Sequence, residues 1–182
     1  MKMQEQYQAE LERSDREHHQ PTAGAMIGHV TANLVVHSLK IEQARLFAKG
    51  TPTLFLATYA SPWIDQEVEF IQRINDALAV EGDLIPTTTK EFIEFSMLEE
   101  DGSLKYAEGN EQLFSLIKDF DTQLLFITRA IKLAEKEEHY GQVRLMEELD
   151  EWIKEQITMG QKFLGHELKE GLYVEEDEEA EE

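Results

Sequence analysis

The chain has 182 residues, of which 41% are hydrophobic, so it can bury one sizeable core but is too short for two. It contains no cysteine, which excludes disulfide bonds and thiolate metal sites and favours a reducing, cytoplasmic compartment. Its 38 acidic and 17 basic residues give a formal net charge of −21, which is the wrong sign for binding a phosphate backbone. We therefore expect a single domain with no nucleic-acid partner.

The N-terminal residues 1–20 are expected to form a polar arm. They lack the apolar segment of a signal peptide, and no later apolar run approaches the length of a membrane span, so no membrane contact is expected. Five acidic residues oppose three basic ones within the arm. Because it has no continuous apolar stripe, the pattern predicts an extended or frayed helix.

The first long helix is predicted from Gly24 to Lys49. Pro21 and Thr22 open it, and Gly50 follows its last turn as a helix terminator would. Its apolar residues return with helical spacing, which predicts one buried face. These residues are Ile27, Val30, Leu34, Leu39, Ile41 and Leu46.

A second helix is predicted from Ser61 to about Glu81, with Pro62 in the first turn, where its missing N–H does no harm. Its apolar face is expected to be buried. That face carries Trp63, Ile64, Val68, Ile71, Ile74 and Leu78. Polar side chains repeat on another face at spacings of four, three and four, namely Asp65, Glu69, Gln72 and Asp76.

The segment between Gly82 and Gly109 is too long for a tight turn, and TKEFIEFSML within it has a helical pattern of its own. Two further amphipathic helices are predicted over about 111–136 and 140–164, followed by an acidic tail over 168–182. Four long helices with one long crossover after the second indicate an all-α, ferritin-like four-helix bundle over residues 21–167. The crossover carries the short extra helix.

Four segments resemble one protein family. They are HHQPTAGAMIGHVTANL (18–34), KGTPTLFL (49–56), IPTTTKEFIEFSMLEED (85–101) and ITMGQKFLG (157–165). Together they are similar to the Dps family of mini-ferritins, in particular to the Dps-type proteins of lactic-acid bacteria. The resemblance implies a hollow homo-oligomer of twelve subunits that binds and stores iron and protects the cell in oxidative stress.

The resemblance also implies where iron would be oxidised, at a centre shared by two subunits and built from histidines and carboxylates. Aligning this chain with the family's sequence pattern, without gaps through the second helix, places five residues at the ligand positions. They are Arg45, Ala57, Ser61, Gln72 and Asp76. Only Asp76 is a conventional ligand, and a guanidinium has no lone pair for a metal. We therefore expect this ferroxidase site to be lost. Arg45 either pairs with Asp76 of the partner subunit or is simply solvated.

Other residues are candidates for metal binding. His18 and His19 lie near the place where some Dps proteins hold an extra metal, although adjacent histidines on a polar arm are often just exposed. Asp65 and Glu69 join Asp76 in a carboxylate stripe that suits hard cations or, alternatively, is a solvated face. His29 and His37, on the first long helix, are interpreted as core or interface residues.

Three functions are compatible with these patterns. The first is an iron-binding cage that has lost its own oxidation centre. The second is a non-catalytic structural protein, or a subunit that co-assembles with an active Dps chain. The third is a ferroxidase with a relocated site that uses Asp65, Glu69 or His37.

Overall fold

The computed structural model describes residues 2–173, which form six α-helices and one 3₁₀ helix and contain no strand. In chain order these are α1 (Met3–His19), α2 (Ala23–Phe47), α3 (Pro52–Glu81), α4 (Thr89–Phe95), η1 (Gly102–Tyr106), α5 (Gly109–Lys136) and α6 (Tyr140–Leu164). Most of the predicted acidic tail, residues 174–182, lies outside the described residues. The all-α class predicted from the sequence is confirmed.

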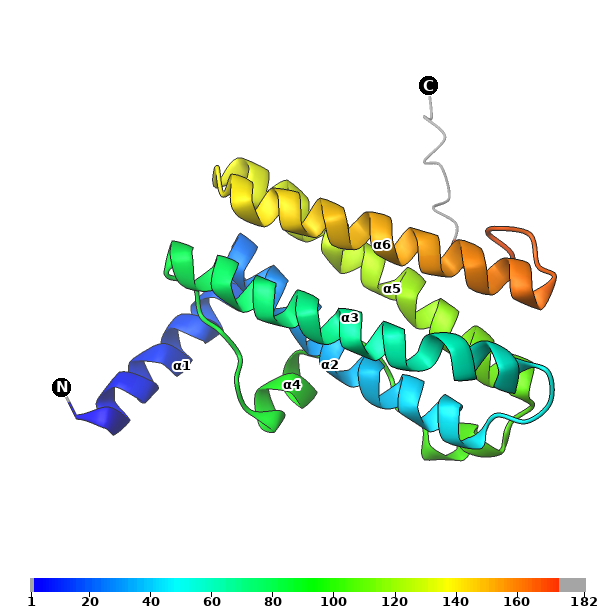
Figure 1. Cartoon of the computed structure of the whole chain (residues 1–182). Coiled ribbons are helices and arrows are strands. Elements are labelled where there is room, and N and C mark those ends of the chain that lie inside the picture. The colour runs from blue at the N-terminus through cyan, green and yellow to red at the C-terminus, as the bar shows by residue number, and fades with distance from the viewer. Residues whose placement is uncertain (1, 174–182) are drawn as a thin grey trace, which may run out of the picture.

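Helices α2, α3, α5 and α6 form the bundle (Figure 1). Helix α2 packs against α3 and α5, and α6 packs against α5 and α3. After α3, the crossover returns along the length of the bundle past α4 and η1, so that α5 runs in the same direction as α3. This is the predicted four-helix topology, with the predicted short helix in the crossover.

The core lies between these four helices and contains three large aromatic side chains, Trp63, Phe70 and Phe120, each at most 2% exposed. Burying side chains of this size supplies much of the hydrophobic stabilisation of a bundle. The chain continues to pack beyond residue 167, because Leu172 joins the core and the backbone N–H of Tyr173 donates to Asp121 Oδ2 at 2.9 Å.

Helix α2 begins where the sequence predicts, because the Thr22 hydroxyl accepts the N–H of Ala25 at 3.1 Å and so caps the first turn. Two members of its predicted apolar stripe were assigned wrongly: Leu39 is 61% exposed and Leu46 is 59% exposed. The other four predicted residues, Ile27, Val30, Leu34 and Ile41, are buried. His37 and Ala44 extend the buried face in place of the two exposed leucines.

The predicted start of the second helix at Ser61 is wrong. Helix α3 begins nine residues earlier, at Pro52, and Pro62 lies inside it. A proline inside a helix removes one hydrogen bond and costs about 3 kcal/mol. Burial of Phe55 and Leu56, at 5% and 1% exposure, offsets this cost and carries the helix past the proline. Val68, predicted to be buried, is 44% exposed.

The N-terminal arm forms α1, a helix of 17 residues with no buried residue. Among the described residues, it contacts the start of α2 and the crossover, and it extends away from the bundle (Figure 1). The arm, predicted as an extended or frayed helix, is a continuous helix from Met3 to His19. Within residues 2–173, no helix is long and apolar enough to span a membrane.

Candidate functional site

The five positions that the sequence resemblance predicts as iron ligands lie on two helices. Arg45 is in the last turn of α2, and Ala57, Ser61, Gln72 and Asp76 lie along α3. The four α3 positions fall within about 100° of one another around the helix axis, so they share one side of the helix. All five side chains are exposed in the single chain.

The chemistry of this set does not suit iron. Arg45 and Ala57 provide no lone pair, Ser61 and Gln72 are neutral, and Asp76 is the single carboxylate. Arg45 is also paired within its own chain, because its Nε and an Nη donate to the two Glu42 carboxylate oxygens at 2.7 and 2.5 Å. These hydrogen bonds raise the pKa of Arg45 and lower the pKa of Glu42.

The neighbouring carboxylates Asp65 and Glu69 are exposed on the same side of α3. The Arg73 guanidinium lies 3.9 Å from Glu69 and makes a shorter, bidentate pair with Glu148 of α6, at 2.7 and 2.6 Å. The Arg73 guanidinium therefore partly neutralises the negative charge of this carboxylate stripe. Within residues 2–173, no group of three or more histidine, cysteine or acidic side chains is arranged to hold a metal ion.

The predicted pair His18 and His19 is not brought together. His19 is exposed, and its Nδ1 donates to the backbone oxygen of Asp15 at 2.7 Å. His18 points the other way, into a cavity of about 300 Å³ between α1, the start of α2 and the crossover. There its ring lies 5.0 Å from that of His29, centroid to centroid.

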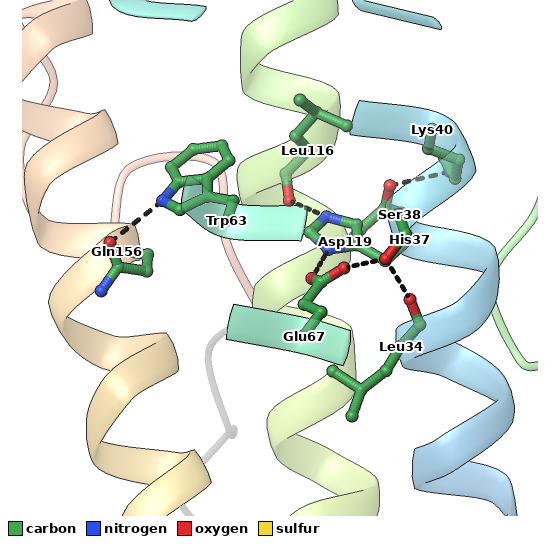
Figure 2. A network of polar contacts seen from close by, with 9 residues as sticks. All are labelled: Leu34, His37, Ser38, Lys40, Trp63, Glu67, Leu116, Asp119 and Gln156. Carbon is green, nitrogen blue, oxygen red and sulfur yellow. Dashed lines mark hydrogen bonds and ion pairs between the residues drawn. The ribbon is translucent and has the colours of Figure 1, made fainter. Parts of the chain in front are cut away.

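A buried polar network crosses the middle of the bundle (Figure 2). His37 of α2 and Glu67 of α3 are both fully buried, with His37 Nδ1 2.5 Å from Glu67 Oε1. The other ring nitrogen of His37 lies 3.2 Å from the backbone oxygen of Leu116 on α5. The Ser38 hydroxyl lies 2.7 Å from the second Glu67 oxygen. The network thereby joins three of the four bundle helices.

The geometry requires His37 to be an imidazolium when Glu67 is ionised. Both ring nitrogens face oxygen acceptors, so both donate a proton. Burial alone would lower the pKa of His37, but the nearby carboxylates of Glu67 and Asp119 hold it above its ordinary value. Asp119 is itself paired with Lys40 at 2.8 Å. A doubly protonated ring has no lone pair, so His37 cannot bind a metal in this arrangement.

His37 lies in the core, one of the two places predicted for it, whereas Glu67 was not among the predicted candidates. A usable signal exists in the spacing of the buried α3 residues Trp63, Phe70 and Ile74, because Glu67 occupies the position between the first two. On α2, His37 occupies the matching gap between Leu34 and Ile41. Two complementary polar residues at core positions of adjacent helices predict a buried pair.

Solved structures resemble this bundle closely. DpsB of Lactococcus lactis MG1363 superimposes with a TM-score of 0.84 and is 37% identical, with 90% of this chain and 95% of that chain covered. DpsA of the same organism superimposes with a TM-score of 0.86 at 34% identity, covering 93% and 99%. The chain belongs to the Dps family. The resemblance read from its sequence motifs is thus confirmed, as is the ferritin-like fold.

A more distant structure, Dps from Listeria monocytogenes, superimposes with a TM-score of 0.77 at 22% identity over 82% of this chain and 97% of that chain, a likeness of fold alone. No protein-family model and no curated protein sequence matches the chain.

Proposed function

We propose that this protein is the subunit of a cytoplasmic Dps cage that binds and stores iron without a ferroxidase centre of its own. The proposal is supported by family membership together with the alignment that the sequence resemblance implies, which leaves Asp76 as the one conventional ligand. The assembly is the twelve-subunit shell that the family implies, and its role is protection against oxidative stress. In this proposal, iron is the stored substrate and not a resident cofactor.

The acidic composition supports iron binding on the cage surface. With a formal net charge of −21 per chain, the assembled shell attracts cations strongly, and carboxylates are suitable ligands for them. Asp65, Glu69 and Asp76 are exposed in the single chain and can contribute carboxylate ligands. The same charge disfavours DNA, so the cage is proposed to act on iron and not on nucleic acid.

The loss of oxidation chemistry is supported by Arg45. A metal ion at its position would face a permanent positive charge that is already held by Glu42. A relocated centre that uses His37 is disfavoured because that ring is engaged on both nitrogens. Iron oxidation would then occur in solution or on the growing mineral, at a rate set by the external oxidant.

The test is an iron-loading experiment on the purified assembly. Ferrous iron is added in air or with peroxide, the protein is separated from free iron, and the retained iron is measured. A ferroxidase-competent Dps is loaded in parallel. We expect iron to be retained but oxidised no faster than in a protein-free control, and an absence of retained iron would contradict the proposal.

The replaced ligand positions also favour a second candidate, a non-catalytic subunit that co-assembles with an active Dps chain. In a mixed shell, the active chain would supply the oxidation centre and this chain would supply acidic surface. Affinity purification of the tagged chain from its own cells, followed by mass spectrometry, distinguishes the two. A second Dps chain at a fixed ratio supports co-assembly, whereas its absence supports the homo-oligomer.

A further inference from the structure

A cavity of about 300 Å³ lies where α1 joins the bundle. Its walls come from α1, from the first turns of α2 and from the crossover around α4. Small-molecule sites usually measure about 300–1,000 Å³, so this cavity suits a small ligand. Apolar side chains form much of its lining, namely Leu11, Ala25, Leu84, Ile85, Pro86 and Phe95. The cavity can therefore hold the hydrocarbon part of an organic molecule.

The α1 wall of the cavity has a nitrogen acceptor that lacks a partner. Nδ1 of His18 lies 2.7 Å from the backbone oxygen of Ser14, which can only accept a proton, so Nδ1 has the hydrogen. In the neutral ring, Nε2 is then an acceptor with a free lone pair. This atom is buried and has no hydrogen-bond partner among the described residues. A ligand with an N–H donor would satisfy it.

The α2 wall offers a second acceptor of the same kind. Nδ1 of His29 donates to the backbone oxygen of Phe95 at 2.8 Å, which leaves Nε2 as the acceptor. Burial lowers the pKa of His29, so its ring is neutral at pH 7. The centres of the two histidine rings are 5.0 Å apart. An ammonium group has three N–H donors and can therefore serve both nitrogens at once.

The charge around the cavity is negative. Five acidic side chains line it, and no lysine or arginine is among its described lining residues. Two of the five are already engaged, because Arg13 pairs with Glu17 at 2.5 Å and Glu91 accepts the N–H of Thr88 in the cap of α4. The other three are Glu10, Asp15 and Glu94. Such a lining repels anions and favours a ligand with positive charge.

We propose that this cavity binds a small aliphatic diamine in its diammonium form. One ammonium donates to the two histidine nitrogens, the methylene chain lies against the apolar walls, and the other ammonium pairs with the carboxylates. An alkylamine resembles the lysine side chain, whose pKa is about 10.4, so both ends are charged at pH 7. The site lies apart from the five predicted ligand positions on α2 and α3, and its ligand is not iron.

A bound diamine has a consequence for the position of α1. This helix has no buried residue, so few contacts hold it at a fixed angle to α2. A ligand that contacts His18 of α1 and His29 of α2 together stabilises the attached position of the arm by mass action. The amide hydrogens of α1 should then exchange more slowly with solvent.

The test is isothermal titration calorimetry of pentane-1,5-diamine into the full-length assembly. About 0.15 M NaCl screens the surface carboxylates, and a chelator removes metal ions. We expect one diamine per chain. His18→Phe keeps the ring that stacks on Phe95 but has no acceptor, and should weaken binding by roughly tenfold or more. The matched control is His19→Phe, which changes the adjacent exposed histidine and should leave the affinity unchanged.

Two further measurements examine the charge and the arm. Pentane-1,5-diol has the same chain but no charge, and we expect it not to bind. Hydrogen exchange followed by mass spectrometry should show that the diamine protects the α1 amides in the wild type but not in His18→Phe.

The proposal is overturned if the wild type binds no diamine, if His18→Phe binds it as tightly as the wild type, or if the diol binds equally well. A loss of affinity in His19→Phe equal to that in His18→Phe would overturn it too, because the binding would then come from the general surface charge. Since α1 buries nothing, His18→Phe preserves the bundle, which circular dichroism verifies. Iron loading should not change in this variant, so failure of the diamine site leaves the proposed storage function standing.

Discussion

At the scale of single residues, the fully buried pair of His37 and Glu67 should be sensitive to the loss of either partner alone. Removing one partner leaves the other as an uncompensated buried charge, which typically costs about 3–5 kcal/mol. We expect Glu67→Ala to lower the free energy of unfolding by about that amount, measured by urea denaturation. Glu69→Ala, two residues along the same helix but exposed, should change it by less than about 0.5 kcal/mol. If the two variants lowered the free energy of unfolding equally, the cost of losing Glu67 would not come from its buried pair with His37.

The same pair makes stability depend on pH. The pKa of His37 is raised in the folded protein, whereas in the unfolded chain it is close to its ordinary value of about 6.5. Protonation therefore stabilises the fold fully below about pH 6.5, and this contribution is lost as the pH rises through the folded value. We expect the free energy of unfolding to decrease as the pH rises above about 6.5.

The control for this pH dependence is the double variant His37→Leu with Glu67→Met, which replaces both charges with apolar groups of similar size. Such replacements of a whole buried pair are often close to neutral for stability. The double variant should lose the alkaline decline in the free energy of unfolding. If its pH profile matched that of the wild type, the decline would have to come from other groups.

At the scale of helices, the beginning of α5 is packed tightly against the α2–α3 loop. A Cβ added at Gly109 would lie 2.1 Å from the backbone oxygen of Lys49, and a backbone atom cannot move aside as a side chain can. We expect Gly109→Ala to lower the free energy of unfolding by about 1–3 kcal/mol, the usual cost of overpacking. Gly141, in the first turn of α6, has open space around its Cβ position. Gly141→Ala should therefore cause no loss, and thermal unfolding of the two variants compares them directly.

Helix positions were largely predictable from the sequence, because each long helix carries an apolar face with regular spacing. The range of α6 agrees with its prediction, and α5 begins two residues earlier than predicted. The start of α3 was not predictable from local rules, which place a proline in the first turn. Two prolines compete for that role, and Pro52 prevails because burial of Phe55 and Leu56 stabilises the intervening turns. That burial depends on the other helices of the bundle.

The candidate sites were likewise predictable only in part. Family motifs predict Arg45 and the four α3 positions as the ligand positions, and this prediction requires no coordinates. The meeting of His18 with His29 was not predictable, because it depends on the angle at which α1 leaves the bundle and on the position of Phe95 in the crossover. Adjacent residues such as His18 and His19 point about 100° apart on a helix, so closeness in sequence was misleading.

At the scale of the whole molecule, the proposed loss of oxidation chemistry depends on two subunits together, because the family's centre is shared between neighbours. Restoring a single ligand should therefore not restore iron oxidation. We expect Arg45→His alone to leave ferrous iron oxidation at the background rate, since Ala57, Ser61 and Gln72 still provide no histidine or carboxylate. Oxygen consumption after addition of ferrous iron to the purified assembly measures this rate.

Restoring conventional ligands at all five positions should restore iron oxidation, which the single change does not. The variant with Arg45→His, Ala57→His, Ser61→Asp and Gln72→Asp, together with native Asp76, recreates two imidazoles and three carboxylates, a mixture that suits iron with open positions for an oxidant. We expect it to consume oxygen or peroxide in proportion to added iron, provided that size-exclusion chromatography shows the same assembly as the wild type. Stoichiometric consumption by the wild type itself would refute the loss of its centre, because the native residues at these positions would then suffice.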